Sequence, residues 1–355
     1  MKSWVRTVRW TALALAALAG VLAVAIALVY QAELRRPVGS ARPFTVAGDP
    51  AVDARLARSG EYLQVRAGSS FGAVLADLRR LGWISRPRVA RWEARRRGWD
   101  RRVVPGWYRR QEGETVGELL ARLARGEVEQ TKVTIPEGWR LPRILATLAD
   151  SAWVPLEQFR RVAADESWLA AQAVPGPGLE GYLLPETYRI PRGEEPRRIL
   201  EQLVRPGRTY WVDSLETAAG AVGLDRRQVW TLASIIEAEA ASAAERERIS
   251  AVFHNRLRLG MRLESDPTVL FALGRRPGRV LYADLEVDSP YNTYRRSGLP
   301  PGPICSPGRA SLRAAVHPEP GCDALFFVAR GDGTHVFSRT LAEHNWNRRV
   351  LRSGG

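Results

Sequence analysis

The feature that most constrains this chain is an apolar run, Trp10–Tyr30, which contains no charged residue. As a helix that rises about 1.5 Å per residue, it would span roughly 30 Å, the thickness of a bilayer core. A secretory signal peptide has a shorter apolar core and a small-residue cleavage site, which this run lacks. The sequence therefore predicts an uncleaved transmembrane anchor at residues 10–30, in contact with lipid, after a short tail at residues 1–9.

The charges predict the orientation of this anchor. The tail contains Lys2, Arg6 and Arg9, and basic residues beside a span are retained in the cytoplasm. We expect the rest of the chain on the outer side of the cytoplasmic (inner) membrane. The formal net charge is +15, of which about +12 lies after the tail. Outside the cytoplasm, a basic surface fits an anionic wall polymer or lipid rather than nucleic acid, and a GC-rich genome is an equally good explanation of the many arginines.

The cysteines and histidines predict neither a metal site nor a cofactor. Cys305 and Cys322 are not spaced as a metal pair or a CxxC motif. An oxidising exterior permits a disulfide between them, and two buried thiols are the alternative. The histidines are scattered without HExxH or HxH spacing, which favours structural roles: His254, His317, His335 and His344.

Three segments share one pattern. They are "RAGSSFGAVLADL" from Arg66, "QEGETVGELLARL" from Gln111 and "PEGWRLPRILATL" from Pro136. Aligned on Gly68, Gly113 and Gly138, their apolar residues coincide at i, i+3, i+4 and i+7, which is one face of a helix. The glycine fits a tight turn, and Ser70 or Thr115 can cap the helix that follows. Each segment therefore predicts a strand-turn-helix unit. Such units resemble LysM modules, which bind N-acetylated wall sugars, and a purely structural reuse of the unit is the alternative.

The expected fold class is α+β, with one N-terminal transmembrane helix. A linker at 31–43 and a LysM-like subdomain at 44–130 precede a mixed α/β domain at 131–350. Periodic apolar residues predict a mostly helical core at 195–260, and the Pro- and Gly-rich segment 274–308 predicts loops. Near the C-terminus, "DALFFVAR" and "THVFSRT" flank a glycine turn and predict a β-hairpin before a last helix.

The stretch "TLASIIEAEA", Thr231–Ala240, places two acids in an apolar helix. The inward face is predicted from four positions: Val229, Leu232, Ile236 and Ala240. Glu237 borders this face, and partial burial would raise its pKa and keep it protonated, as a general acid requires. Glu239 points elsewhere, toward solvent or a nearby arginine. Helix geometry alone also allows Glu237 to be a salt-bridged structural residue.

Several blocks, in order, carry a resemblance to a known family. They are "VTIPEGW", "LEGYLLPETY", "TLASIIEAEA…AERERISAVFHNRLRLGMRLESDPTVLFALG", "YNTYRRSGLPPGPICSPG", "AAVHPE" and "LFFVARGDGTHVFSRTLAEHN". Together with the anchor and the LysM-like region, they make nearly the whole chain similar to the YceG-like, MltG-type endolytic murein transglycosylases. The resemblance implies an inner-membrane lyase that needs no cofactor. It cuts peptidoglycan strands internally at the MurNAc–GlcNAc β-1,4 bond and leaves a 1,6-anhydro-MurNAc end.

The resemblance also implies which residues do this work. The family's catalytic glutamate falls on Glu237, which serves first as acid and then as base. Candidate substrate-binding residues follow from the matched blocks: Asn292, Tyr291, Tyr294, Asp266, Glu180 and Glu186. Asn292 suits hydrogen bonds to the sugar and Tyr294 suits stacking, whereas Asp266 can instead cap a helix near Pro267. Glu180 and Glu186 flank the cleft or tie domains together.

A peptidoglycan synthase is an expected partner by resemblance alone, because the family is thought to terminate growing strands. The chain departs from the family pattern at His254 and Ser306, which leaves subsite details open. Two alternatives remain: a non-catalytic wall-binding scaffold, and a true muramidase that uses water and a second carboxylate.

Overall fold

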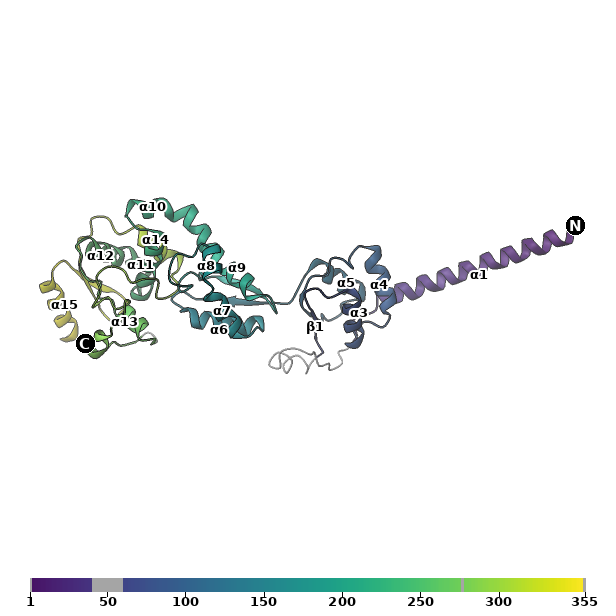
Figure 1. Ribbon diagram of the computed structural model, residues 1–355, viewed down its shortest axis with the longest axis horizontal. Helices are drawn as coiled ribbons and strands as arrows, with labels where there is room; N and C mark the ends of the chain where they lie inside the picture. The colour runs from purple at the N-terminus through teal and green to yellow at the C-terminus, as the bar shows by residue number, and fades with distance from the viewer. Residues whose placement is uncertain (1, 40–59, 276–277, 354–355) are drawn as a thin grey trace. The chain divides into compact units, whose positions relative to one another are not determined.

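The structure is a computed structural model that describes residues 2–39, 60–275 and 278–353 (Figure 1). It separates into two compact units. Unit 1 comprises Met1–Thr131 and Pro191–Gly193, and unit 2 comprises Lys132–Ile190 and Glu194–Gly355. The end of the predicted linker and the start of the predicted LysM-like region, residues 40–59, lie outside the described residues.

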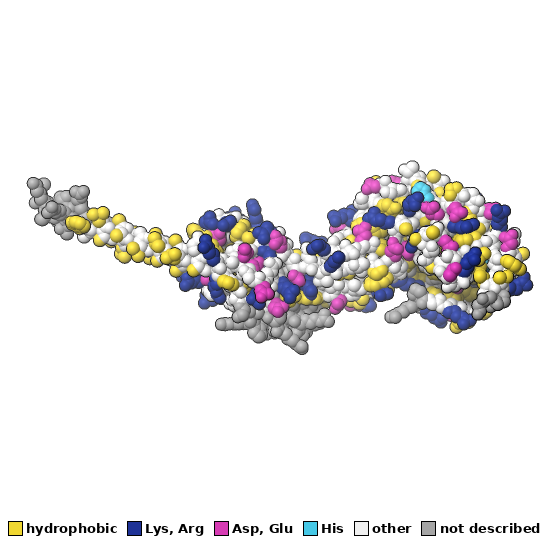
Figure 2. Space-filling model, turned by 180° about the vertical axis from the view of Figure 1, so that it is seen from behind, with side chains coloured by type: hydrophobic (Ala, Val, Ile, Leu, Met, Phe, Trp, Pro, Cys, Tyr) yellow, Lys and Arg dark blue, Asp and Glu magenta, His cyan; other side chains and the backbone are white. Residues whose placement is uncertain are grey.

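The N-terminal helix α1 (Lys2–Leu34) contains a segment, Leu13–Leu34, that is long and apolar enough to cross a membrane. The most apolar 18 residues of this segment have a mean hydropathy of 2.6, and none of these 18 residues is buried. Figure 2 shows hydrophobic side chains along the exposed length of this helix. Residues 31–39, predicted as linker, finish α1 and then join unit 1, because Val38 is buried and its N–H donates to the carbonyl oxygen of Glu114 at 2.7 Å.

The rest of unit 1 has the order strand, helix, helix, strand, helix. The elements are β1 (Tyr62–Val65), α3 (Phe71–Arg80), α4 (Pro87–Arg96), β2 (Gly106–Arg109) and α5 (Val116–Arg125). The two strands pair antiparallel with Tyr62 opposite Arg109 and Val65 opposite Gly106. The helices cover this ribbon with their apolar faces and form one hydrophobic core.

The predicted strand-turn-helix pattern is confirmed for all three segments, of which the third, with Gly138 at its turn, belongs to unit 2. Gly68 and Gly113 adopt left-handed backbone conformations with φ of 76° and 73°, which glycine reaches without strain. Ser70 caps α3, and Thr115 caps α5 as part of a capping box. The aligned apolar residues of the two helices are buried: Val74, Leu75 and Leu78, and Leu119, Leu120 and Leu123. Sugar binding by this unit stays a prediction.

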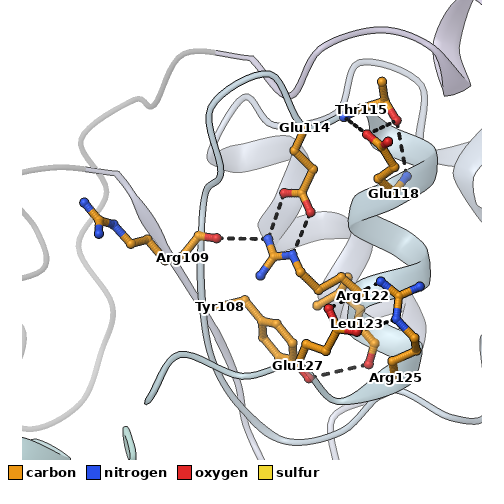
Figure 3. Close-up of polar contacts among 9 residues, drawn as sticks. All are labelled: Tyr108, Arg109, Glu114, Thr115, Glu118, Arg122, Leu123, Arg125 and Glu127. Carbon is orange, nitrogen blue, oxygen red and sulfur yellow. Dashed lines mark hydrogen bonds and ion pairs between the residues drawn. The ribbon is translucent and has the colours of Figure 1, made fainter. Parts of the chain in front are cut away.

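A buried ion pair holds α5 against the segment that precedes it (Figure 3). Arg122 Nε donates to Glu114 Oε1 at 2.6 Å and Nη2 donates to Oε2 at 2.8 Å, with both side chains 5% exposed. Nη2 also donates to the carbonyl oxygen of Arg109 at 2.9 Å. Because each carboxylate oxygen has a donor, the pair offsets the cost of burying two charges.

Unit 2 is mostly helical, as predicted. The strands β3 (Gln130–Thr134) and β4 (Thr187–Pro191) pair and carry the chain between the units. In chain order, the first helices of unit 2 are α6 (Leu141–Ala152), α7 (Leu156–Ala163), α8 (Glu166–Ala171), α9 (Pro196–Tyr210), the π-helical turn η1 (Trp211–Leu215) and α10 (Glu216–Ala221). The helices that follow are α11 (Arg226–Glu239), η2 (Ala243–Glu245), α12 (Arg246–Arg258), α13 (Asp266–Ala272), η3 (Tyr282–Glu286) and α14 (Arg309–Val316). The predicted hairpin, β5 (Phe326–Ala329) with β6 (His335–Ser338), and the last helix, α15 (Leu341–Ser353), are confirmed.

Helix α11 lies at the centre of unit 2, with α12, α13 and α14 packed around it (Figure 1). Every residue from Val229 to Ile236 is buried. The expectation of a single inward face is therefore too narrow, because neighbouring elements cover the helix on all sides. Its start is defined by a capping box in which Asp225 and Gln228 each accept a backbone N–H of the other.

Polar side chains of α12 connect it to its neighbours. Arg256 Nε donates to the carbonyl oxygen of Leu325 at 2.6 Å, just before β5, and Asn255 Nδ2 donates to the carbonyl oxygen of Ala324 at 3.0 Å. His254 Nε2 lies 2.8 Å from the carbonyl oxygen of Ala315 on α14, which is the structural role expected of this histidine. The last turns of α12 are thereby held beside the end of α14 and the start of the hairpin.

We expect Arg122→Met to destabilise unit 1 by about 3–5 kcal/mol, because it leaves the Glu114 carboxylate buried without its partner. Arg125→Met, on the same helix, is the matched control, since the Arg125–Glu127 pair is 57% and 51% exposed and is worth about 0–1 kcal/mol. Hydrogen exchange of unit 1 peptides in the full-length protein measures both. Equal effects of the two substitutions would contradict the assignment.

Candidate functional site

Glu237 lies near the end of α11 with its side chain 7% exposed. Oε2 accepts hydrogen bonds from the backbone N–H of Gly308 at 2.9 Å and from Ser311 Oγ at 2.8 Å. Oε1 lies 3.5 Å from Nη2 of Arg246. Both oxygens of this buried carboxylate therefore have a donor.

The starts of two helices supply these donors. Gly308 is the N-cap residue of α14, where backbone N–H groups are free and the helix dipole is positive. Arg246 is the first residue of α12, and its Nε donates to Ser311 Oγ at 3.0 Å. Ser311 thus accepts from Arg246 and donates to Glu237. Polar donors that stabilise negative charge therefore face the oxygens of Glu237, and its ion pair with Arg246 is the salt bridge that helix geometry had left open.

A second carboxylate, Glu137, lies beside this site. Its Oε2 is 3.8 Å from the same Nη2 of Arg246, and its side chain is 48% exposed. A Cβ atom on Gly308 would come within 1.8 Å of Glu137 Oε1, so the carboxylate lies against the bare Cα of this glycine. Burial, and next the charge of Glu237, raise the pKa of Glu137, and Arg246 opposes this shift.

Two loops that are distant in sequence bring Glu137 to this place. The N–H of Gly138 donates to the carbonyl oxygen of Ser306, and the N–H of Ser306 donates to that of Trp139, both at 2.9 Å. The sequence analysis missed Glu137 as a site residue, although it quoted the block that contains it. Periodicity along one helix carries no information on this loop-to-loop pairing.

Glu180, predicted to flank the cleft, binds the start of a helix. Its carboxylate oxygens accept the backbone N–H of Leu141, the first residue of α6, at 3.0 and 3.1 Å. Burial raises the pKa of Glu180 to about 7, against the lowering effects of this hydrogen bond and of Arg140. Burial, followed by the charges of Glu237 and Glu180, raises the pKa of the Cys305 thiol. Gly181, which follows Glu180, lies against the carbonyl oxygen of Cys305, and Cys305 Sγ donates to the carbonyl oxygen of Ser234 on α11 at 3.4 Å. Glu180 therefore lies on the same side of the unit as Glu237.

Two further predicted residues border this region. Tyr291 is partly buried against Phe271, with the ring centroids 4.8 Å apart. Burial and then the charge of Glu180 raise its pKa. Glu186 forms an ion pair with Arg309, which directly follows Gly308 at the start of α14. The structure thus brings Glu180, Tyr291 and Glu186 into the surroundings of Glu237.

Asp266, Tyr294 and Glu239 form a separate polar cluster. Tyr294 Oη donates to Asp266 Oδ1 at 2.7 Å, and Ser265 Oγ donates to Glu239 Oε1 at 2.6 Å. The N-cap residue of α13 is Ser265, so Asp266 is not the cap. Burial raises the pKa of Glu239 to about 7. The expectation that Glu239 faces solvent or an arginine is wrong, because the loop that carries Ser265 covers the end of α11.

Asn292 has a structural role in its loop. It is fully buried, and its Nδ2 donates to the carbonyl oxygens of Leu285 and Val287, both at 2.8 Å. Its Oδ1 accepts the N–H of Tyr294 at 3.0 Å. Every polar atom of this amide is therefore occupied by backbone, and we withdraw Asn292 from the sugar-binding candidates.

No group of three His, Cys, Asp or Glu side chains in the described parts of the chain is arranged to hold a metal ion. Cys305 and Cys322 are both free thiols, so they form no disulfide; Cys305 is buried as expected for that alternative, whereas Cys322 is half-buried.

The model of the YceG-like family matches residues 63–350. The chain belongs to the YceG-like family. It is 33% identical over 301 residues to the endolytic murein transglycosylase of Bacillus subtilis, with 80% of this chain and 82% of the relative covered. It is 26% identical over 274 residues to the endolytic murein transglycosylase of Streptococcus pneumoniae strain D39, with 68% of this chain and 49% of the relative covered.

A crystal structure of a YceG-like protein from Listeria monocytogenes is also similar, with a TM-score of 0.57 and 31% identity, covering 81% of this chain and 99% of that one. In this YceG-like protein the matched range contains the whole site, including Glu137, Glu237 and the start of α14.

The raised pKa of Glu239 predicts a pH dependence of stability. The folded state binds this proton more tightly than the unfolded state. Ionisation of Glu239 therefore lowers the free energy of unfolding, an effect that is absent below about pH 4.5 and grows as the pH rises to about 7. Glu239→Gln keeps an acceptor for Ser265. We expect it to raise the free energy of unfolding by about 1–3 kcal/mol at pH 8 and to change little at pH 4.5. Urea unfolding at both pH values is the measurement, and equal changes at both would refute the buried-acid assignment.

Asn292→Ala removes three hydrogen bonds to buried backbone groups. We expect a loss of about 2–4 kcal/mol in stability and an unchanged KM for glycan strands. Asn347→Ala is the control, because Asn347 Nδ2 makes one bond, to Ser338 Oγ at 2.9 Å, and should cost about 1 kcal/mol. A raised KM with full stability would return Asn292 to the sugar-binding candidates.

Proposed function

We propose that this protein is an endolytic lytic transglycosylase that acts on peptidoglycan glycan strands, with Glu237 as its catalytic acid and base. Relatives named endolytic murein transglycosylase support the activity. The observation that carries the assignment is the setting of Glu237, a carboxylate 7% exposed that is held by the start of α14 and by Arg246.

The proposed bond is the MurNAc–GlcNAc β-1,4 linkage. Protonated Glu237 gives its proton to the glycosidic oxygen while the bond from this oxygen to C1 of MurNAc breaks. The C6 hydroxyl of the same MurNAc then attacks C1, and its proton passes to the Glu237 carboxylate. This closes a 1,6-anhydro ring, consumes no water and returns Glu237 to its starting form.

The donors around Glu237 act in the first step. When the proton leaves, negative charge appears on a buried group that already faces the Gly308 N–H, the Ser311 hydroxyl and the Arg246 guanidinium. Because these donors are in place before the reaction, they stabilise that charge without reorganisation. This lowers the barrier to protonation of the leaving oxygen.

Five of the predicted substrate-binding residues are proposed to contact the glycan. One set lies near Glu237 and the scissile bond, and the other lies further away. Glu180, Tyr291 and Glu186 belong to the nearer set, since they lie in the surroundings of Glu237 and Glu186 is 36% exposed. Asp266 and Tyr294 belong to the more distant set beside Glu239. Tyr294 offers a ring and Asp266 an exposed carboxylate to a sugar.

A muramidase hydrolase is the second candidate, and Glu137 is the observation that favours it. Hydrolysis by a glycosidase ordinarily needs two carboxyl groups, one as acid and one as base or nucleophile. Glu137 provides a second carboxyl near Glu237. The two reactions differ in their products, because the anhydro end is lighter by one water than a reducing end.

Membrane anchoring determines where the reaction is proposed to occur. Helix α1 is long and apolar enough to span the bilayer, and Lys2, Arg6 and Arg9 favour a cytoplasmic N-terminus. Unit 2 would then act outside the cytoplasmic membrane on strands that are still close to it. Such strands are the products of a peptidoglycan synthase, so we propose that the enzyme terminates nascent strands beside one.

Mass spectrometry of uncrosslinked glycan strands treated with the full-length protein tests this function. We expect internal cuts that end in anhydro-MurNAc, and a loss of roughly 10²–10⁴-fold in rate for Glu237→Gln. Reducing ends would instead identify a hydrolase. Glycan binding without any cleavage by the unsubstituted protein would identify a scaffold.

A further inference from the structure

Two carboxylates converge on one guanidinium nitrogen and one glycine. Glu237 Oε1 and Glu137 Oε2 lie 3.5 and 3.8 Å from Nη2 of Arg246. Glu237 accepts the N–H of Gly308, and Glu137 lies against the Cα of the same residue. The surroundings of the two groups differ, since Glu237 is 7% exposed and Glu137 is 48% exposed.

The proposed reaction requires a protonated Glu237 before the bond breaks. The Gly308 N–H, the Ser311 hydroxyl and Arg246, however, all stabilise the ionised form of Glu237. Oε2 already accepts two hydrogen bonds. Oε1 has only the 3.5 Å contact to Arg246 and is therefore the oxygen available for the proton.

A neighbouring negative charge is the feature that favours such a proton. Two carboxylates in close proximity resist double ionisation, so that one proton remains with the pair. Arg246 offsets only part of this repulsion, because both contacts are long and its Nε is bonded to Ser311. The other groups nearby add little charge: burial keeps the Cys305 thiol protonated, and Arg309 is paired with Glu186.

We propose that Glu137 and Glu237 hold one proton between them around Arg246, and that Glu137 is the positioning residue that retains this proton at the site. The proposal rests on the function proposed above. The proton passes from Glu237 Oε1 to the glycosidic oxygen, and the proton of the C6 hydroxyl replaces it.

Gly308 gives a second way to disturb this pair. Its φ is −74°, which any residue adopts, so Gly308→Ala retains the backbone N–H that binds Glu237. The new Cβ would come 1.8 Å from Glu137 Oε1 and 2.3 Å from its Cδ, and would push that flexible side chain aside. Glu137→Gln removes the charge in place, and Gly308→Ala displaces it.

The experiment is the pH–rate profile of strand cleavage by the full-length protein, for the unsubstituted chain, Glu137→Gln, Glu137→Asp, Gly308→Ala and the double variant. The alkaline limb reports loss of the shared proton from the pair. Without the neighbouring charge, this limb should move to lower pH by about one unit, which is a loss of roughly tenfold at pH 8 with the acid limb retained. In Glu137→Asp, which keeps the charge, the limb should shift less. Gly308→Ala should show the same shift as Glu137→Gln, and combining these two substitutions should cause no further shift.

Glu157→Gln is the matched control, because Glu157 is 62% exposed in an ion pair with Arg160 outside the site. A loss of rate that is uniform with pH, or no change in Glu137→Gln, would overturn the proposal. Melting temperatures of all variants show that they are folded. The chemical form of the new glycan ends tests the proposed function. The pH of the alkaline limb tests the shared proton of Glu137 and Glu237. Either proposal can therefore fail while the other holds.

Discussion

The burial of one carboxylate, that of Glu237, is the interaction on which the arrangement of unit 2 depends. A buried charge without partners costs several kcal/mol, so a chain that places an acid at the end of a buried helix must bring donors to it. Here α14 contributes the N–H of its N-cap residue and a hydroxyl, and α12 contributes its first side chain. Three helices therefore meet at one functional group.

This requirement explains why the neighbours of α11 are fixed so firmly. Helix α12 is joined to α14 through His254 and to the start of the hairpin through Arg256. Each bond lies a few turns from Arg246, on the helix that presents it. A shift of α12 along α14 would break these contacts together with the bond from Arg246 to Ser311. The geometry of the site is thus set by rigid helices rather than by its own loops.

Sequence patterns within one segment predicted the features that depend on interactions within that segment. The glycine turns at Gly68 and Gly113, the two capped helices after them and the C-terminal hairpin follow from periods and turn chemistry. The complete burial of α11, the hydroxyl that covers Glu239 and the amide role of Asn292 depend on which loops fold over which helix ends. No pattern within one segment contains that information, and the place of Glu137 is unpredictable for the same reason.

The position of Glu137 also bears on which reaction the site can perform. Since both acids contact one nitrogen of Arg246, the oxygens that do so are at most about 7 Å apart, which is near the short end of the roughly 6.5–9.5 Å that separates the carboxyls of inverting hydrolases. In retaining enzymes the closer pair has the anomeric carbon between its members. Here both carboxyls lie within 4 Å of one nitrogen of Arg246. A pair that faces a shared cation can hold one proton for the leaving oxygen, and attack by the substrate's own hydroxyl then needs no second carboxyl as base or nucleophile.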